Sequence, residues 1–175
     1  MSDGDERLAP AELKKLFLFE ALNDEQLEWV AGCGKVESYP QGSTVFREGD
    51  PATCFYVLLD GTIRLTRQVR GEEVETIRSE LRGSYAGATQ FVLADRDKKQ
   101  FYPHSVYAIT DARLLLLPSP QLGERFRTWF PMATHLLEGM FLGQRNSMLV
   151  VEQRERLLAL GTLASGLTHE LNNPA

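Results

Sequence analysis

A series of short β-favouring runs, separated by single glycines between Val36 and about Leu117, is the feature that most constrains the fold. In one run the apolar residues Ile63 and Leu65 alternate with the polar residues Thr62 and Arg64. The runs recur about every ten residues, which is the spacing of an all-β sandwich or barrel. Parallel strands need long crossover connections, so this spacing predicts an antiparallel sheet. The separating glycines are Gly42, Gly49, Gly61, Gly71 and Gly83.

Helical patterns flank this β region. Residues 8 to about 34 are predicted to be helical, with an apolar cluster followed by a second helix that Asn23 or Asp24 can cap. That helix should end near Gly32 and Gly34. From Gln121 onward the helical period returns, and residues from about 144 to 173 can form one continuous helix. The apolar cluster of the first segment is Leu13, Leu16, Phe17 and Phe19.

Apolar residues along the C-terminal helix repeat at alternating steps of three and four. This spacing predicts a coiled-coil seam that joins two copies of the chain in a parallel homodimer. The alternative is that the same residues form the buried face of a helical bundle within one chain. The residues of this predicted seam are Leu157, Leu160, Ala164, Leu167 and Leu171.

Composition excludes several classes of protein. Lys and Arg total 19 against 24 Asp and Glu, so the net charge of −5 argues against a broad nucleic-acid-binding surface. The two cysteines, Cys33 and Cys54, do not have the spacing of metal ligands, so we expect no metal site and a reducing, cytoplasmic compartment. No run approaches the roughly 18 apolar residues of a membrane span, so we expect no membrane insertion.

Several motifs in the β region occur in the order found in one known family. They are Tyr39 with Gly42, "FREGD" at Phe46–Asp50, "FYVLLDGTIRL" at Phe55–Leu65 and "AITDARLLLL" at Ala108–Leu117. In this order the chain resembles the cyclic nucleotide-binding domain family, which includes the catabolite activator type. The resemblance implies a mixed β/α sensor domain over residues 8–142. Its fold would be an eight-stranded antiparallel β-roll, a double-stranded jelly roll flanked by helices.

The ligand site departs from the pattern of the family. Members that bind cyclic nucleotides use a glutamate to bind the ribose 2′-hydroxyl and an arginine to pair with the cyclic phosphate. Here Ala88 stands at the position of the glutamate and Tyr102 at that of the arginine. Losing two charge-assisted contacts costs several kcal/mol, at about 1.5–3 kcal/mol each, so we expect no tight cyclic nucleotide binding. The sequence does not predict which ligand the domain binds. The candidate pocket residues are Gly87, Ala88, Thr89, Tyr102 and His104.

The last sixteen residues, "LGTLASGLTHELNNPA", carry a second resemblance. They are similar to the phosphoacceptor box of sensor histidine kinases. His169 follows the seam residue Leu167 by two positions, which places it on the outer face of the predicted helix. The resemblance implies that His169 is phosphorylated, that Glu170 is its general base and that Asn173 orients the water used in dephosphorylation. The alternative is that this segment is simply the end of a helix and that His169 is a solvent-exposed residue without a catalytic role.

Together the two resemblances imply that the chain is the N-terminal sensory and dimerisation part of a cytoplasmic two-component sensor histidine kinase. Residues 143–175 would be its signalling and dimerisation helix. We expect no cofactor in this part, which alone should catalyse nothing, because ATP and Mg²⁺ would bind the catalytic domain of the full-length parent. The expected partners are a second copy and the receiver domain of a response regulator. The alternative function is a non-catalytic adaptor that dimerises through its C-terminal helix.

Overall fold

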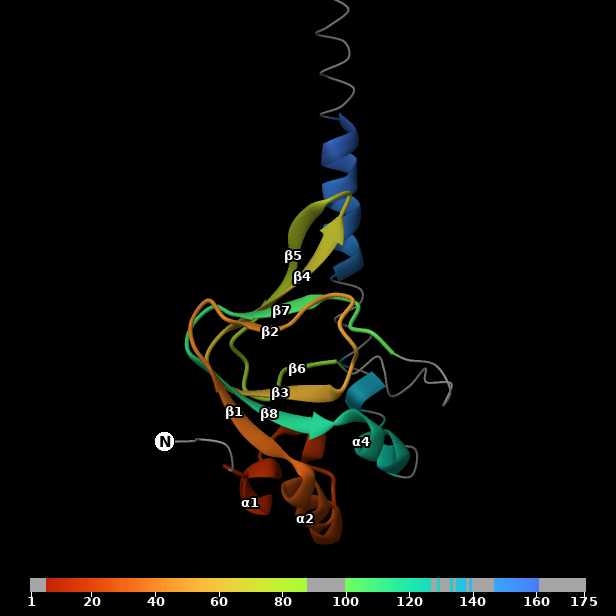
Figure 1. The fold of residues 1–175 in the computed structure, drawn as a ribbon. Helices are drawn as coiled ribbons and strands as arrows, with labels where there is room; N and C mark the ends of the chain where they lie inside the picture. The colour runs from red at the N-terminus through yellow and green to blue at the C-terminus, as the bar shows by residue number, and fades with distance from the viewer. Residues whose placement is uncertain are drawn as a thin grey trace, which may run out of the picture.

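The computed structural model describes residues 6–87, 100–126, 129, 133, 135–137, 139 and 147–160. Two small β-sheets face each other and form a roll (Figure 1). Helices cover the roll at one end, and a helix of residues 147–160 projects beyond the other end (Figure 1). The predicted β-roll between flanking helices is therefore confirmed.

Eight strands within the described residues form two four-stranded sheets. One sheet has the order β1-β8-β3-β6 and the other the order β2-β7-β4-β5, and the strand pairings among the described residues are antiparallel. The strands are β1 (Lys35–Tyr39), β2 (Thr44–Phe46), β3 (Cys54–Asp60), β4 (Ile63–Val69), β5 (Glu72–Ser79), β6 (Tyr85–Ala86), β7 (Ser105–Ala108) and β8 (Ala112–Pro118).

The apolar run of β3 is explained by burial on both of its faces. Phe55 and Val57 pack toward the helices, in a core that also contains residues of α2 and β8. Tyr56 and Leu58 alternate with them and point into the space between the two sheets. A strand with both faces covered reads as a continuous apolar run instead of an alternating pattern.

The N-terminal helices are α1 (Pro10–Leu13), the 3-10 turn η1 (Phe17–Phe19) and α2 (Asp24–Cys33). The predicted cap of α2 is confirmed, because the Asn23 side chain accepts a hydrogen bond from the Gln26 backbone N–H at 2.9 Å. The Gln26 side chain accepts one from the Asn23 N–H at 3.0 Å, which completes a capping box. Of the predicted apolar cluster, Leu13, Leu16 and Phe19 are buried, whereas Phe17 is 51% exposed and packs on the ring of His135.

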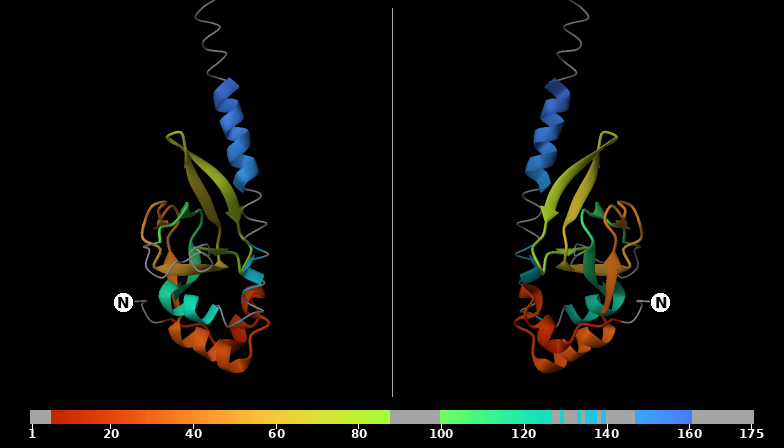
Figure 2. Two further views of the ribbon diagram at one scale, coloured as in Figure 1. Left: turned by 90° about the vertical axis from the view of Figure 1, so that its right-hand side faces the viewer. Right: turned by 90° about the vertical axis from the view of Figure 1, so that its left-hand side faces the viewer.

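The hairpin of β4 and β5 turns through Arg70 and Gly71, which both have positive φ, at 51° and 85°. Positive φ at both loop residues is typical of the type I′ turn, whose twist matches that of the flanking strands. The hairpin projects from the roll in the same direction as the 147–160 helix, and both views in Figure 2 show the two side by side.

After β8 the chain continues into α4 (Ser119–Phe126) and then, beyond residues that are described only in part, into the 147–160 helix. Two residues of the predicted seam, Leu157 and Leu160, are 55% and 62% exposed. Ala164, Leu167 and Leu171 lie outside the described residues, so a long coiled coil stays a prediction. In the part of the chain that the structure describes, none of the helices has the length and apolar character needed to cross a membrane.

Candidate functional site

Tyr102, which is predicted to occupy the position of the family's phosphate-binding arginine, lies inside the roll just before β7. Only 3% of Tyr102 is exposed. Its hydroxyl donates a hydrogen bond to the Cys54 carbonyl at 2.8 Å and accepts one from the Cys54 N–H at 3.0 Å. Its ring stacks on Phe46 of β2, with the ring centroids 3.9 Å apart and an angle of 24° between the planes. The phenol therefore bonds to β3, while its ring packs against the opposite sheet.

Gly87 follows the end of β6 and lies next to Cys54 and Tyr102. Its φ of +81° lies in the left-handed region. A Cβ at this position would lie 2.9 Å from the Cys54 carbonyl oxygen and 3.2 Å from Tyr102 Cε1. The chain can follow this close path only with glycine. The structure thus brings two predicted pocket residues, Gly87 and Tyr102, into one tightly packed group with Cys54.

The inside of the roll is aromatic and aliphatic. The Tyr56 ring lies 5.1 Å from that of Phe46 and 6.2 Å from that of Tyr102, measured between centroids. Burial raises the pKa of Tyr56 well above its ordinary value, so this phenol stays neutral. Among the described residues the buried polar ones are uncharged, namely Thr66, Thr76, Ser105 and Ser119. Among the described residues, the interior of the roll therefore contains no buried cationic side chain that could pair with a phosphate.

His104 lies at the edge of the roll and is half-buried. Burial lowers its pKa, the charge of Arg67 lowers it further, and Glu48 opposes both effects. The imidazole is therefore mainly neutral at pH 7, which makes His104 a weak source of positive charge for an anionic ligand. The other predicted pocket residues, Ala88 and Thr89, lie outside the described residues.

The predicted phosphoacceptor residues His169, Glu170 and Asn173 also lie outside the described residues, so their roles remain predictions. Among the residues that are described, no group of three or more His, Cys, Asp or Glu side chains is placed to hold a metal ion.

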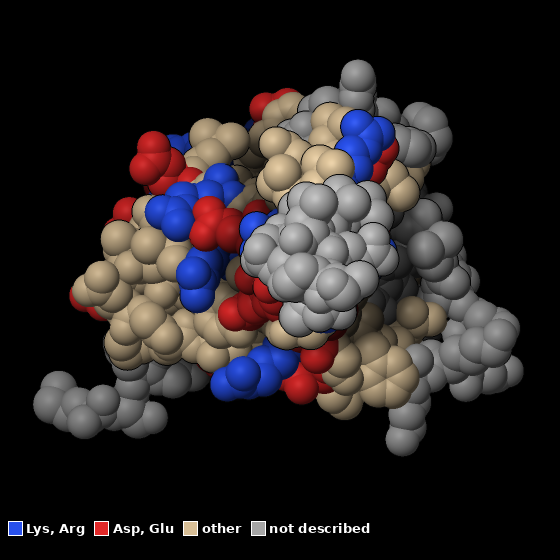
Figure 3. Space-filling view, turned by 90° about the horizontal axis from the view of Figure 1, so that it is seen from above, with Lys and Arg blue, Asp and Glu red and all other residues tan. Residues whose placement is uncertain are grey.

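The end of the molecule that carries the 147–160 helix shows Lys and Arg close to Asp and Glu on the face seen in Figure 3. Within the sheet of β4, β5 and β7, charged side chains also contact neutral partners on neighbouring strands. Glu73 accepts hydrogen bonds from the Tyr107 hydroxyl at 2.6 Å and from the Thr66 hydroxyl at 2.8 Å. The guanidinium of Arg64 lies over the Tyr107 ring, 5.0 Å from its centroid. The visible face has mixed charge instead of a basic patch.

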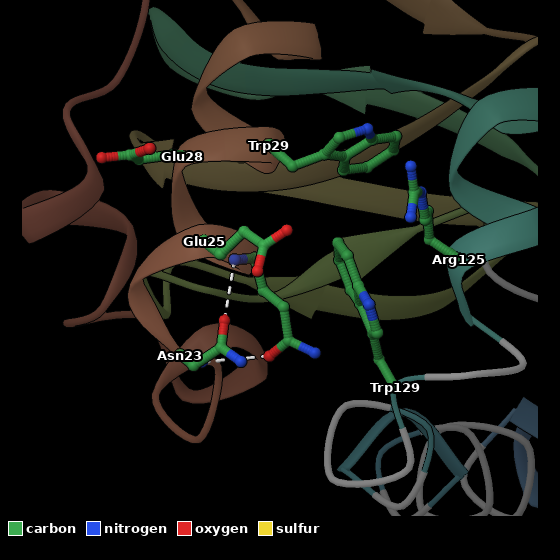
Figure 4. A pocket seen from close by; sticks show the side chains of 7 residues that line it. Asn23, Glu25, Glu28, Trp29, Arg125 and Trp129 are labelled. Atoms are coloured by element: carbon green, nitrogen blue, oxygen red, sulfur yellow. Dashed lines mark hydrogen bonds between the residues drawn. The ribbon is translucent and has the colours of Figure 1, made fainter.

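Sequence reasoning did not identify a pocket of about 480 Å³ between α2 and α4. The indoles of Trp29 and Trp129 meet there edge to face, with their centroids 5.3 Å apart, and the Arg125 guanidinium lies over Trp29 (Figure 4). Figure 4 also shows the Glu28 side chain pointing away from the two indoles. The side-chain oxygens of Asn23 and Gln26, which line the pocket, are used in the capping box. Helix capping and core packing account for most of these groups.

The buried hydroxyl of Tyr102 gives a direct test of the geometry inside the roll. Replacing Tyr102 with Phe keeps the ring on Phe46 but leaves the N–H and carbonyl of Cys54 without their partner. We expect the free energy of unfolding to fall by about 2 kcal/mol, the cost of leaving buried polar groups unpaired. Chemical denaturation followed by circular dichroism measures the change.

Tyr107→Phe is the matched control, because the hydroxyl of Tyr107 bonds to an exposed carboxylate, where water can replace it. It should lower the free energy of unfolding by less than about 0.5 kcal/mol. Equal losses for the two variants would show that the hydroxyl of Tyr102 is not held by Cys54 in solution.

Comparison with known proteins agrees with this architecture. The profile of the cyclic nucleotide-binding domain family matches residues 36–128. Among solved structures, the sensor domain of the transcriptional regulator DNR from Pseudomonas aeruginosa superposes with a TM-score of 0.63 at 22% identity, covering 76% of this chain and 91% of that one. The catabolite activator protein of Thermus thermophilus gives a TM-score of 0.58 at 24% identity, covering 84% of this chain and 62% of that one. Both similarities show the fold.

Among curated proteins, the global nitrogen regulator of Synechocystis is 30% identical over 105 residues, which are 60% of this chain and 45% of that protein. Human cGMP-dependent protein kinase 2 is 26% identical over 84 residues, which are 47% of this chain. The chain spans less than half the length of the nitrogen regulator and 11% of the length of the kinase.

Proposed function

Because this chain belongs to the cyclic nucleotide-binding domain family through residues 36–128, we propose that it is the sensory and dimerisation part of a cytoplasmic two-component sensor histidine kinase. One observation carries the proposal. The sequence "LGTLASGLTHELNNPA" follows the sensor fold and its projecting helix, and it has the histidine, the glutamate, both asparagines and the proline of a phosphoacceptor box. In a sensor histidine kinase, a sensor domain precedes the helix that carries the phosphorylated histidine, and this chain has the same order.

The roll supplies the sensing function in this proposal. Its ligand is not a cyclic nucleotide, because Tyr102 takes the place of the arginine and Ala88 that of the glutamate. The buried phenol of Tyr102 and the uncharged interior around it support this statement. The relatives include the sensor domain of a transcriptional regulator and a nitrogen regulator, so a sensory use of the fold in regulatory proteins is well supported.

The projecting helix supplies dimerisation. Two leucines on its surface, Leu157 and Leu160, are more than half exposed, and large apolar side chains of this kind are stabilised by burial against a second copy. The sequence continues their spacing through Ala164, Leu167 and Leu171. A parallel pair would place both rolls at the same end and both phosphoacceptor histidines at the other.

The chemistry proposed for His169 is phosphoryl transfer. A neutral imidazole nitrogen attacks the γ-phosphorus of ATP, the N–P bond forms, and the bond from phosphorus to the departing ADP oxygen breaks. Glu170 holds the other ring nitrogen and accepts its proton. ATP and Mg²⁺ are brought by the catalytic domain of the parent protein. The phosphate then passes to the receiver domain of a response regulator, and Asn173 orients the water that later removes it.

Labelling of the parent protein tests the proposal. Incubated with Mg²⁺ and ATP carrying labelled γ-phosphate, the parent should incorporate label that is lost in acid and kept in base, as a phosphohistidine is. Proteolysis should place the label in the peptide that contains His169. A parent protein that incorporates no label, or carries it on a peptide from another segment, would overturn the kinase proposal and leave the non-catalytic adaptor.

A further inference from the structure

The 147–160 helix contacts the tip of the β4–β5 hairpin through an ion pair. The Arg154 guanidinium lies 2.5 Å from the carboxylate of Glu72, which is the first residue of β5 and follows the Arg70–Gly71 turn. The side chains of Glu72 and Arg154 are 49% and 43% exposed, so water screens the pair only in part. The side-by-side course of helix and hairpin in both views of Figure 2 agrees with this contact.

The helix presents different faces to the hairpin and to solvent. Leu158 and Val151 are half-buried and lie about 40° and 60° to one side of Arg154 around the helix axis. At about 100° per residue, Leu157 and Leu160 lie roughly 60° and 120° to the other side of Arg154. They are exposed, so the hairpin leaves the predicted dimer seam uncovered.

A short path through the fold joins this ion pair to the inside of the roll. Tyr102 lies three residues before β7, and β7 pairs with β4 along its length. β4 in turn pairs with β5 up to Val69 and Glu72, at the hairpin tip. A shift of β7 that follows a change at Tyr102 can therefore reach Glu72 through the pairing of Ser105 with Thr66 and then along β4 from Thr66 to Val69, the part of the β4–β5 ladder beyond its bulge at Leu65 and Thr66.

We infer that the Glu72–Arg154 ion pair fixes the rotation of the helix about its own axis, and so directs Leu157 and Leu160 toward a second copy. The hairpin is then the part of the sensor domain that regulates the dimer seam. The inference rests on the homodimer of the proposed function. It predicts that the strength of dimerisation depends on two charges that lie outside the seam itself.

Charge exchange tests the inference on the full 175-residue chain, with the dimer dissociation constant measured by sedimentation equilibrium at low salt. Glu72→Arg and Arg154→Glu should each raise this constant about fivefold, which corresponds to the loss of an ion pair of about 1 kcal/mol. The double variant, with the charges exchanged, should return to within about twofold of the natural chain. Near 1 M salt, where the screening length is about 3 Å, the differences should disappear.

Arg156→Gln is the matched control on the same helix, because Arg156 pairs with Glu152 one turn away and not with the hairpin. It should leave the dissociation constant within about twofold of its natural value. Single charge variants that dimerise like the natural chain, or a double variant that fails to recover, would overturn the inference.

Leu160→Asp separates this inference from the proposed dimer. It should produce monomers, because a carboxylate in the seam would lose its hydration. If Leu160→Asp stays dimeric, the seam is wrong and the ion-pair inference fails with it. If it is monomeric while the charge variants behave like the natural chain, the dimer of the proposed function stands and only the inference about the hairpin is overturned.

Discussion

Replacing Gly61 with Ala should lower the free energy of unfolding by about 2 to 5 kcal/mol. Gly61 lies in the loop between β3 and β4 with a φ of +89°, a conformation that costs an alanine about 1 to 2 kcal/mol. A Cβ there would also lie 2.3 Å from the Asp111 carbonyl oxygen and 2.7 Å from Ala112 Cα. Both neighbours are backbone atoms where β8 begins, so they cannot move aside without shifting a central strand. Overpacking of this kind costs about 1 to 3 kcal/mol more.

Gly42→Ala separates the two causes. Gly42 has a similar φ of +80°, but no atom lies within 4 Å of the Cβ it would gain. It should therefore show the backbone cost alone, about 1 kcal/mol. Urea unfolding of both variants gives the comparison. Equal losses at the two positions would mean that the close approach of the β3–β4 loop to β8 does not exist in solution.

Replacing His169 with Ala in the parent protein should reduce incorporation of acid-labile phosphate to background, because the proposal assigns the N–P bond to the imidazole of His169. Glu170→Gln keeps the size of the side chain but removes the proton acceptor, so labelling should slow by about a hundredfold or more. Asn173→Ala should leave labelling unchanged and slow the loss of phosphate from the response regulator. A time course of labelling, followed by transfer to the receiver domain, measures all three effects.

His135→Ala is the control for these variants. His135 packs against Phe17, with the ring centroids 4.3 Å apart, and it belongs to the sensor domain. Its replacement should leave labelling intact. Persistent acid-labile labelling of the His169→Ala variant would show that the phosphoacceptor lies elsewhere and would remove the main support for the kinase proposal.

Local sequence signals predicted the parts of the fold that depend on neighbouring residues. The cap of α2 could be predicted because Asn23 and Gln26 lie three residues apart and bond to each other. The antiparallel roll could be predicted because turn glycines such as Gly61 and Gly71 occur between short β runs. Both features come from conformational preferences over a few residues.

Long-range side-chain pairing could not be predicted in this way. The sequence predicted that Tyr102 replaces an arginine, but it did not predict that the Tyr102 hydroxyl bonds to Cys54, 48 residues earlier in the chain. Nor did it show that Glu72 would meet Arg154, which is 82 residues away. Such contacts depend on how the two sheets face each other and on where the projecting helix passes the hairpin. No pattern of hydrophobicity or turn residues encodes these positions.

Calorimetric titration of the chain with cyclic AMP and cyclic GMP tests most directly whether Tyr102 closes the anion-binding position of the roll. Because the Tyr102 phenol is buried and held by two hydrogen bonds, we expect no saturable heat below about 1 mM nucleotide. A dissociation constant of about 1 mM corresponds to a binding free energy of only about −4 kcal/mol. The double variant Ala88→Glu with Tyr102→Arg should bind more tightly than the natural chain, since it restores both charged contacts. Saturable heat from the natural chain at micromolar nucleotide would show instead that Tyr102 leaves the pocket and that the roll binds cyclic nucleotides without the arginine.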